Sequence, residues 1–378
     1  CLGPNFQQNK RFLEGTRNVG KQIQREIQQI LEFPHIALVA SGGGQRAAVS
    51  LIGFLYQLEK EAMLDTLLYI GGVSGSTWSM AFLYNDPQWS SNMDEAVSKL
   101  VGPGVELEHA VAWLTEKSKE EDFSLTDIWG VLTSAGIMKQ MDKRRLSEEV
   151  SRNVTNPYPV YCALEKHCKW FEVSPHEAGF TELNLFVETS LLGSKFHNGE
   201  LMEKKPEMDM IRLQDNSVPD CLQTKEEFHL IDAGLLINMA YPSFLGEKRD
   251  IDLIIAPESS AGIMFEVDYA AEVNKPFPQI DDKILEESDW PKDCYVFEGK
   301  EKEPTIIYMP LFNQQNCKGC REFWRLCPLV VGRGGEVNPL QQAAVKHHVI
   351  SKQRFVRELE RINSRQRNPT AKSERCLV

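Results

Sequence analysis

Two segments of this chain, each an apolar run followed directly by glycines and then by a helical pattern, constrain its fold most strongly. Residues 35–40 are almost wholly apolar, and residues 41–44 continue them as Ser-Gly-Gly-Gly. A helix face follows, marked by Ala47, Leu51, Leu55 and Leu58. The same order then repeats, with a strand expected at 67–70, a tight turn at 71–76 and a helix at 77–84. Such strand–turn–helix units predict an α/β protein with a parallel sheet covered by helices.

The rest of the chain fits this fold class and contains no visible linker. Residues 92–152 have a polar, helical pattern, and the charged stretch 199–227 has the pattern of a loop. Further strands are expected at 228–231, 251–256, 294–297 and 305–311, and amphipathic helices at 10–32 and 340–363. We therefore predict a single domain over residues 1–378, made of the N-terminal helix at 10–32, a core at about 35–315, and a basic C-terminal helix and tail at 340–378.

The composition is that of an ordinary globular protein, and it narrows the range of partners. The chain has 378 residues, of which 42% are hydrophobic and 25% charged, and its net charge is −12. Proteins that bind nucleic acids are generally basic, so we expect no nucleic-acid partner. No apolar run reaches the roughly 18 residues of a membrane-spanning helix. Nine cysteines at irregular spacing favour a cytoplasmic location with free thiols.

The second turn, Gly72-Val73-Ser74-Gly75-Ser76, has the pattern of a nucleophile elbow. In such an elbow, a serine on a sharp turn between a strand and a helix projects its hydroxyl from the sheet, and small neighbours relieve the strain. The helix that follows directs its positive N-terminal end at the same point. The string alone is weak evidence, but here it follows an apolar strand. Ser74 is therefore a candidate nucleophile.

The first turn, Ser41-Gly42-Gly43-Gly44-Gln45-Arg46, can hold a negative charge. Consecutive glycines let backbone N–H groups crowd toward one point, which suits a phosphate or the oxyanion of acyl transfer. The Gly-Lys-Ser/Thr of a phosphate-binding P-loop is absent, and so is a dinucleotide fingerprint. An oxyanion hole is thus the favoured interpretation. Arg46 can in addition bind a substrate phosphate through its planar guanidinium.

A third strand end carries Asp232-Ala233-Gly234 and supplies a carboxylate. A buried or hydrogen-bonded carboxylate can take the proton of a serine hydroxyl, so we expect a buried Asp232 in contact with Ser74. A Ser-His-Asp triad would need a histidine later in the chain, where only His347 and His348 occur. These histidines lie in the amphipathic stretch near the C-terminus, which favours a serine–aspartate dyad.

These motifs together resemble those of the group IV cytosolic phospholipase A2 family, which has a patatin-like catalytic domain. The resemblance also includes Trp-Phe-Glu-Val-Ser-Pro-His-Glu-Ala-Gly-Phe at 170–180, Gly-Ser-Lys-Phe at 193–196 and Lys-Pro-Phe-Pro-Gln-Ile at 275–280. It runs from about residue 10 to 315 and is greatest to the gamma form, which lacks the calcium-binding C2 domain. It implies a three-layer α/β/α fold with a mostly parallel central sheet. The cap is expected to be shortened, because residues 199–227 stand where the family has a longer insertion.

The resemblance implies a role for each candidate residue. Ser74 would be the nucleophile and Asp232 the base that activates it. Gly43 and Gly44 would donate hydrogen bonds to the oxyanion, and Arg46 would face the phosphate of a phospholipid.

Arg249 lies 17 residues after Asp232, where the family has a functional arginine, so the resemblance also places it at the substrate phosphate. The implied activity is calcium-independent hydrolysis of fatty-acyl esters of glycerophospholipids and lysophospholipids, or transfer of the acyl group to another lipid. No cofactor and no metal are expected, and the implied partner is the surface of intracellular membranes. The residues themselves leave two alternatives open: an esterase with a Ser-His-Asp triad, and a non-catalytic lipid-binding protein.

Two features near the C-terminus bear on membranes and metals. Residues 346–378 hold nine Lys or Arg and three Glu, and a basic stretch of this kind can lie on an anionic lipid surface. A solvated helix would have the same composition. Cys317-Lys-Gly-Cys320 has no second cysteine pair nearby, so we expect no zinc site there.

Overall fold

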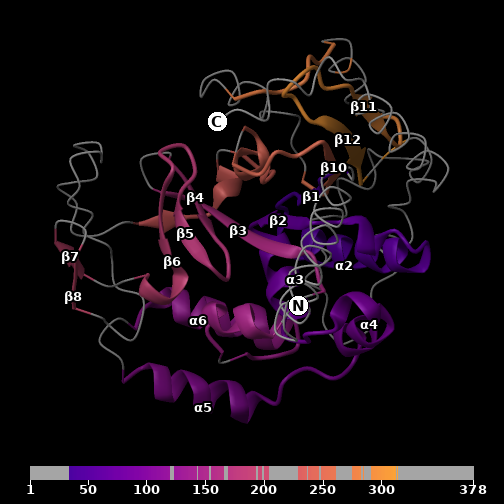
Figure 1. Ribbon diagram of the computed structural model, residues 1–378. Coiled ribbons are helices and arrows are strands. Elements are labelled where there is room, and N and C mark those ends of the chain that lie inside the picture. The colour runs from indigo at the N-terminus through magenta and orange to yellow at the C-terminus, as the bar shows by residue number, and fades with distance from the viewer. Residues whose placement is uncertain are drawn as a thin grey trace, which may run out of the picture. The chain divides into compact units, whose positions relative to one another are not determined.

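A computed structural model contains both predicted strand–turn–helix units at the centre of a large sheet (Figure 1). Strand β1 (Ile36–Ala40) leads into helix α2 (Gly44–Lys60), and β2 (Tyr69–Val73) leads into α3 (Gly75–Leu83). The two strands pair in parallel, with Leu38 opposite Ile70. All five residues of β1 are buried, which is expected of a strand covered on both faces.

The structure describes residues 34–119, 123–142, 144–152, 155–165, 169–192, 195–197, 200–203, 229–235, 237–246, 248–260, 275–281, 284, 291–311 and 313. Those from Ile36 onward belong to one compact unit, Ile36–Ile350. The predicted helices at 10–32 and 340–363 and the basic tail lie outside the described residues. Most of the stretch 199–227 lies outside them as well, so the single-domain organisation and the shortened cap stay predictions.

The main sheet has ten strands, in the order β11-β12-β10-β1-β2-β3-β4-β5-β6, with β9 paired to β3. Its centre is parallel and contains β12 (Thr305–Pro310), β10 (Leu253–Glu258), β1, β2 and β3 (Tyr158–Glu165). The antiparallel strands are β11 (Tyr295–Phe297), β4 (Lys169–Val173), β5 (Glu177–Phe180), β6 (Leu185–Glu188) and β9 (Leu230–Ile231). A separate ribbon pairs β7 (Lys195–His197) with β8 (Glu200–Glu203). The α/β class predicted from the sequence is confirmed.

Helices cover one face of the parallel strands. Because β1, β2 and β3 follow one another in the sheet, the right-handed crossovers between them place α2 and α3 on the same side, and these two helices pack together. The predicted helical region contains α4 (Met93–Val101), α5 (Leu107–Lys117) and α6 (Leu125–Val131), which lie below the sheet in Figure 1. Helix α6 begins with a capping box between Ser124 and Asp127.

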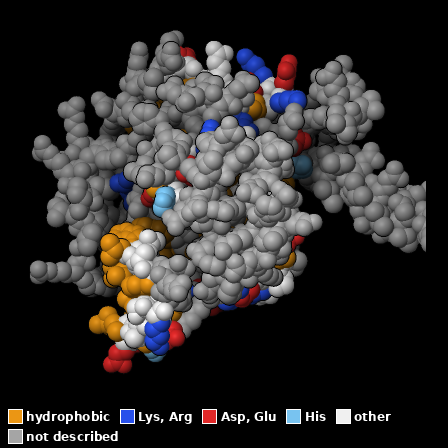
Figure 2. All heavy atoms as spheres, turned by 90° about the vertical axis from the view of Figure 1, so that its left-hand side faces the viewer, with side chains coloured by type: hydrophobic (Ala, Val, Ile, Leu, Met, Phe, Trp, Pro, Cys, Tyr) orange, Lys and Arg blue, Asp and Glu red, His pale blue; other side chains and the backbone are white. Residues whose placement is uncertain are grey.

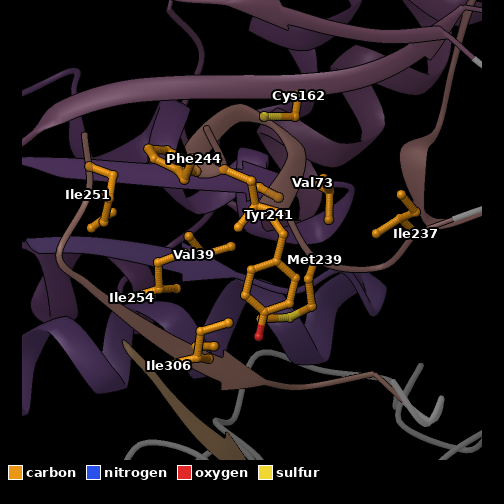
Figure 3. Close-up of a cluster of buried hydrophobic side chains, with 14 of the residues drawn as sticks. Val39, Val73, Cys162, Ile237, Met239, Tyr241, Phe244, Ile251, Ile254 and Ile306 are labelled. Atoms are coloured by element: carbon orange, nitrogen blue, oxygen red, sulfur yellow. The ribbon is translucent and has the colours of Figure 1, made fainter. Parts of the chain in front are cut away.

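The opposite face of the sheet is covered by the segment that follows the candidate aspartate. Val39 of β1, Ile254 of β10 and Ile306 of β12 pack there against Tyr241 and Phe244 (Figure 3). Those two aromatic residues belong to the short 3₁₀ helix η7 (Tyr241–Phe244), which lies directly above the strands. Both faces of the parallel strands are therefore covered by other elements. This packing fixes the position of the strand ends that carry the motifs.

The antiparallel half of the sheet, β3 to β6, was not expected from the strand pattern. Strands β4, β5 and β6 have only four or five residues each, which is too few to show a clear alternation. Strand β2 also begins later than the predicted 67–70, because a 3₁₀ turn at Leu64–Thr66 precedes it and Leu68 points into solvent.

A matched pair of leucine truncations tests this core. Leu38 is fully buried in β1, whereas Leu107 at the start of α5 is 76% exposed. We expect Leu38→Ala to lower the free energy of unfolding by about 2–5 kcal/mol, because it removes buried methyl groups and leaves a cavity. Leu107→Ala should change it by about 0.5 kcal/mol or less. Urea unfolding followed by circular dichroism measures both, and equal effects would contradict the central place of β1.

Candidate functional site

Ser74 occupies the elbow that the sequence predicts. It is the N-cap of α3, directly after β2, and its backbone has φ 51° and ψ −127°. A residue with a side chain rarely adopts such a conformation, which costs of order 1–3 kcal/mol and is typical of functional turns. Two hydrogen bonds between Ser76 and the backbone of Val73 hold the turn from below. The sharp turn thus presents the Ser74 side chain at the carboxyl end of β2.

Asp232 lies next to Ser74, as expected. The Ser74 hydroxyl donates to Asp232 Oδ2 at 2.8 Å, although 158 residues separate the two in sequence. The other carboxylate oxygen, Oδ1, accepts from the backbone N–H of Gly234 at 2.9 Å, which fixes the orientation of the carboxylate.

The expected burial of Asp232 is wrong, because the structure leaves this residue exposed. Asp232 follows β9, a strand of only two residues whose one partner is the end of β3. Leu230 in the same strand is also exposed. A short peripheral strand provides little cover, so the carboxylate is held by hydrogen bonds rather than by a dry pocket.

The glycine loop after β1 meets the elbow through backbone atoms. Gly43 has φ 131° and Gly44 has φ 61°, a left-handed region that favours glycine. A Cβ atom on Gly75 would overlap the carbonyl of Gly44, so the first turns of α2 and α3 are in direct contact. Within the described residues, the N–H groups of Gly43 and Gly44 make no hydrogen bond to another protein group. Two helix N-termini and two free amides therefore converge beside Ser74.

Ser259, at the end of β10, holds this loop in place. Its backbone N–H donates to Ser41 Oγ at 2.6 Å, and its carbonyl accepts from Arg46 Nε at 2.7 Å. The Ser259 hydroxyl also donates to Ser50 Oγ in α2 at 2.9 Å. Arg46 thus lies in the first turn of α2 with one edge of its guanidinium fixed. Sequence reasoning missed Ser259, because a serine after a strand carries no distinctive signal.

Arg249 is buried and is not available at the surface of the candidate site. Arg249 is only 8% exposed, and its guanidinium binds both oxygens of Glu172 at 2.6 and 3.1 Å and the carbonyl of Ser243. Burial by itself would raise the pKa of Glu172, but Arg249 and Lys248 hold that pKa below its usual value. The expectation that Arg249 faces a substrate phosphate is therefore not supported by this placement. Arg249 instead ties the segment after Asp232 to β4.

Other expectations fall partly outside the described residues. His347, His348 and the cysteines from Cys317 to Cys327 are not described. Cys162 and Cys294 are buried free thiols, and burial raises the pKa of Cys162 to about 12. Among the described residues, no group of His, Cys, Asp and Glu is arranged to hold a metal ion. No helix in the described part has the length and apolarity to cross a bilayer.

Comparison with known proteins finds similarity to lipid hydrolases. A family model described as the lysophospholipase catalytic domain matches residues 36–213. Human cytosolic phospholipase A2 gamma is 23% identical over 444 aligned residues, which cover 78% of this chain and 82% of that protein. Human cytosolic phospholipase A2 zeta is 31% identical over 448 aligned residues, covering 80% of this chain and 52% of the relative. Both alignments are longer than this chain, so they include positions that it lacks.

Solved structures agree on the fold. Human GIVD cytosolic phospholipase A2 has a TM-score of 0.73 at 20% identity, covering 89% of this chain and 63% of the solved chain. The same human protein in complex with methyl gamma-linolenyl fluorophosphonate has a TM-score of 0.69 at 24% identity, covering 88% and 60%. This chain thus spans less than two thirds of the solved protein and about half of the zeta relative.

Substitution of Arg249 separates a structural role from a role in binding phosphate. Removing one partner of a buried ion pair leaves an uncompensated charge, so Arg249→Ala should lower stability by about 3–5 kcal/mol at pH 7. Lys248→Ala, which removes a more exposed partner of the same Glu172, should cost about 1 kcal/mol or less. Chemical denaturation of both variants measures this difference.

The effect of Arg249 should also depend on pH. Because the pKa of Glu172 is lowered in the folded state, the stability from this pair is present at neutral pH and is lost as the pH falls through that lowered value. The difference between wild type and Arg249→Ala should therefore shrink in acid. An Arg249→Ala variant as stable as wild type at pH 7 would contradict the structural role.

Proposed function

Because the chain is similar to cytosolic phospholipases A2 in sequence and fold, we propose that it is a phospholipase A2 and lysophospholipase that hydrolyses fatty-acyl esters of glycerophospholipids. The observation that carries this proposal is the 2.8 Å hydrogen bond from the Ser74 hydroxyl to Asp232, at the meeting point of two helix N-termini. The proposed place of action is the cytoplasmic surface of intracellular membranes.

In the first step, Asp232 takes the proton of Ser74 while Oγ forms a bond to the ester carbonyl carbon. The carbonyl oxygen becomes an oxyanion, and the free N–H groups of Gly43 and Gly44 are its proposed donors. Donors of this kind contribute about 2.7–4 kcal/mol each to the lowering of the barrier. The carbon–oxygen bond to the glycerol then breaks, and Asp232 returns the proton to the leaving oxygen. The products of this step are an acyl-serine and a lysophospholipid.

In the second step, a water molecule loses its proton to Asp232 and attacks the acyl-serine. Ser74 recovers a proton as the acyl–oxygen bond breaks, and a free fatty acid leaves. If the hydroxyl of another lipid replaces the water, the same step becomes acyl transfer. The proposed chemistry uses side chains and backbone amides of this chain, so we expect activity to persist in the presence of a calcium chelator.

Substrate binding is proposed to involve Arg46. Its Nε is held by the carbonyl of Ser259, which orients the guanidinium, and Arg46 lies two residues after Gly44 in the first turn of α2. A guanidinium at this place suits a planar, charge-assisted contact with a phosphate. The positive ends of α2 and α3 favour the same anionic group.

The two alternatives are less well supported by the geometry. In a Ser-His-Asp triad the histidine lies between serine and aspartate, whereas here Ser74 and Asp232 are in direct contact. A protein that only binds lipid has no need for the strained backbone of Ser74 or for unpaired amides beside it.

An exposed apolar face supports attachment to a membrane surface. Leu125, Trp129 and Leu132 follow one another at helical spacing on α6 and its continuation, and they are 83%, 58% and 58% exposed. Leu107 and Val111 of α5 are exposed as well. Figure 2 shows hydrophobic side chains gathered over these helices. Apolar patches of this kind mark interaction sites, and a phospholipid bilayer is the occupant that the proposed substrate requires.

The first test of the proposal replaces the two members of the dyad. Ser74→Ala should abolish release of fatty acid from phospholipid vesicles, and Asp232→Asn should lower it by about 10⁴-fold, because the carboxamide keeps the shape but takes no proton. Ser118→Ala, on the exposed end of α5, serves as the matched serine control and should remain fully active.

A fluorophosphonate probe distinguishes the proposed enzyme from its alternatives. The Ser74 oxygen should bond to phosphorus with loss of fluoride, as an activated serine does, and mass spectrometry should locate the adduct on Ser74. The double variant His347→Ala, His348→Ala should label at the wild-type rate. Wild-type protein that does not label would indicate a lipid-binding protein, and loss of labelling in the histidine variant would indicate a triad.

The membrane surface is tested separately from the chemistry. The double variant Leu125→Ala, Trp129→Ala should sediment less with phosphatidylcholine vesicles than wild type, by about tenfold in partition coefficient, because it withdraws two large apolar side chains from the lipid. Its hydrolysis of a soluble short-chain ester should remain unchanged. Leu68→Ala, at an exposed leucine elsewhere, is the control. Equal sedimentation of all three proteins would exclude this face as the docking surface.

A further inference from the structure

Asn238 occupies a fixed position beside the dyad, although no motif in the sequence points to it. Its neighbours Ile237 and Met239 both belong to the buried hydrophobic cluster on the face of the sheet that η7 covers (Figure 3). The carbonyl of Asn238 accepts a hydrogen bond from the N–H of Gly42 at 2.8 Å, and Met239 forms a β-bridge with Ser41. The backbone of this residue is thus tied directly to the glycine loop.

The Asn238 side chain lies between the glycine loop and the aspartate turn. A Cβ atom on Gly42 would overlap Asn238 Oδ1 and would lie 3.0 Å from Ser74 Cβ. A Cβ atom on Gly234 would lie 2.9 Å from the same Oδ1 and 3.2 Å from Asp232 Oδ1. The carboxamide is therefore close to both members of the dyad, and it reaches this place because two glycines leave room for it.

This carboxamide has hydrogen-bonding capacity that the described residues leave unused. Asn238 is half-buried, and across the described residues its side chain makes no hydrogen bond to a protein group. An amide group carries two N–H donors and an acceptor oxygen, and rotation about its last torsion angle presents either kind of atom at the same point. A half-buried, unpaired amide is costly unless a ligand or water satisfies it.

We propose that Asn238 is a further catalytic residue, whose carboxamide N–H donates to the oxygen of the reacting ester together with the amides of Gly43 and Gly44. This inference rests on the proposed function of the site and extends it by one side-chain donor. Asparagine amides and backbone amides commonly share the stabilisation of an oxyanion. The donor is pre-positioned, since buried neighbours on both sides and the bond to Gly42 fix its backbone.

The test compares Asn238→Ala and Asn238→Asp with wild type in steady-state hydrolysis and in fluorophosphonate labelling of Ser74. Asn238→Asp keeps the size of the side chain but has no N–H to donate when ionised. We expect both variants to lose about 10²–10³-fold in kcat with a change of less than about threefold in KM, because the donor acts on charge that develops during the reaction. The labelling rate should fall in parallel.

Asn156→Ala provides the matched control. Asn156 is also half-buried, but it bonds to Ser90 and Pro87, which follow α3. The Asn156→Ala variant should have a lower midpoint of thermal unfolding and an unchanged kcat. Asn238→Asp should instead have a lower kcat and an almost unchanged midpoint of thermal unfolding. Wild-type kcat in Asn238→Asp, or a kcat that falls only with the midpoint, would overturn the proposal. Wild-type protein that neither hydrolyses esters nor labels at Ser74 would contradict the proposed function itself.

Discussion

The parallel pairing of β1, β2 and β3 is the constraint on which the site depends. Strands that run in the same direction end at the same edge of a sheet, so the loops after β1 and β2 meet there. Each loop turns at once into a helix, which brings the positive ends of α2 and α3 together. The contact between Gly44 and Gly75 is close enough to exclude side chains from the interface. A parallel sheet with glycine turns therefore creates an electropositive point before any catalytic group is added.

Asp232 is positioned next to Ser74 by a different set of contacts. Asp232 follows β9, which pairs antiparallel with the end of β3, and the next segment crosses the sheet as the cover of its second face. Arg249 and Glu172 anchor that segment to β4, while Asn238 ties it to the glycine loop. The position of the carboxylate is thus set by the packing of residues 237–251 against the core, not by the short strand that precedes it. A buried ion pair remote from the dyad can in this way determine its geometry.

The strands and turns that carry the site could be predicted from the sequence, because the apolar and glycine patterns that determine them lie within a few neighbouring residues. The strand before Ser41, the elbow at Ser74 and the contact with Asp232 all followed from such patterns or from the resemblance they support. Strands β4, β5 and β6 were missed because each has only four or five residues, too few to show a clear alternation. The burial of Arg249 and the exposure of Asp232 were also missed, since both depend on which distant segments cover them. A charged residue looks the same in sequence whether it meets solvent or a buried partner.

The exposure of Asp232 has a consequence for the chemistry. In water, the attraction between a carboxylate and a serine proton is weak, and solvent competes for both groups. When an acyl chain or a lipid surface covers the site, water leaves, the local dielectric constant falls, and hydrogen bonds to the developing charge strengthen. An exposed dyad beside unpaired amides is therefore suited to a substrate that brings its own apolar environment. A phospholipid does so, whereas a small soluble ester does not, and this difference favours lipid hydrolysis over general esterase activity at the same residues.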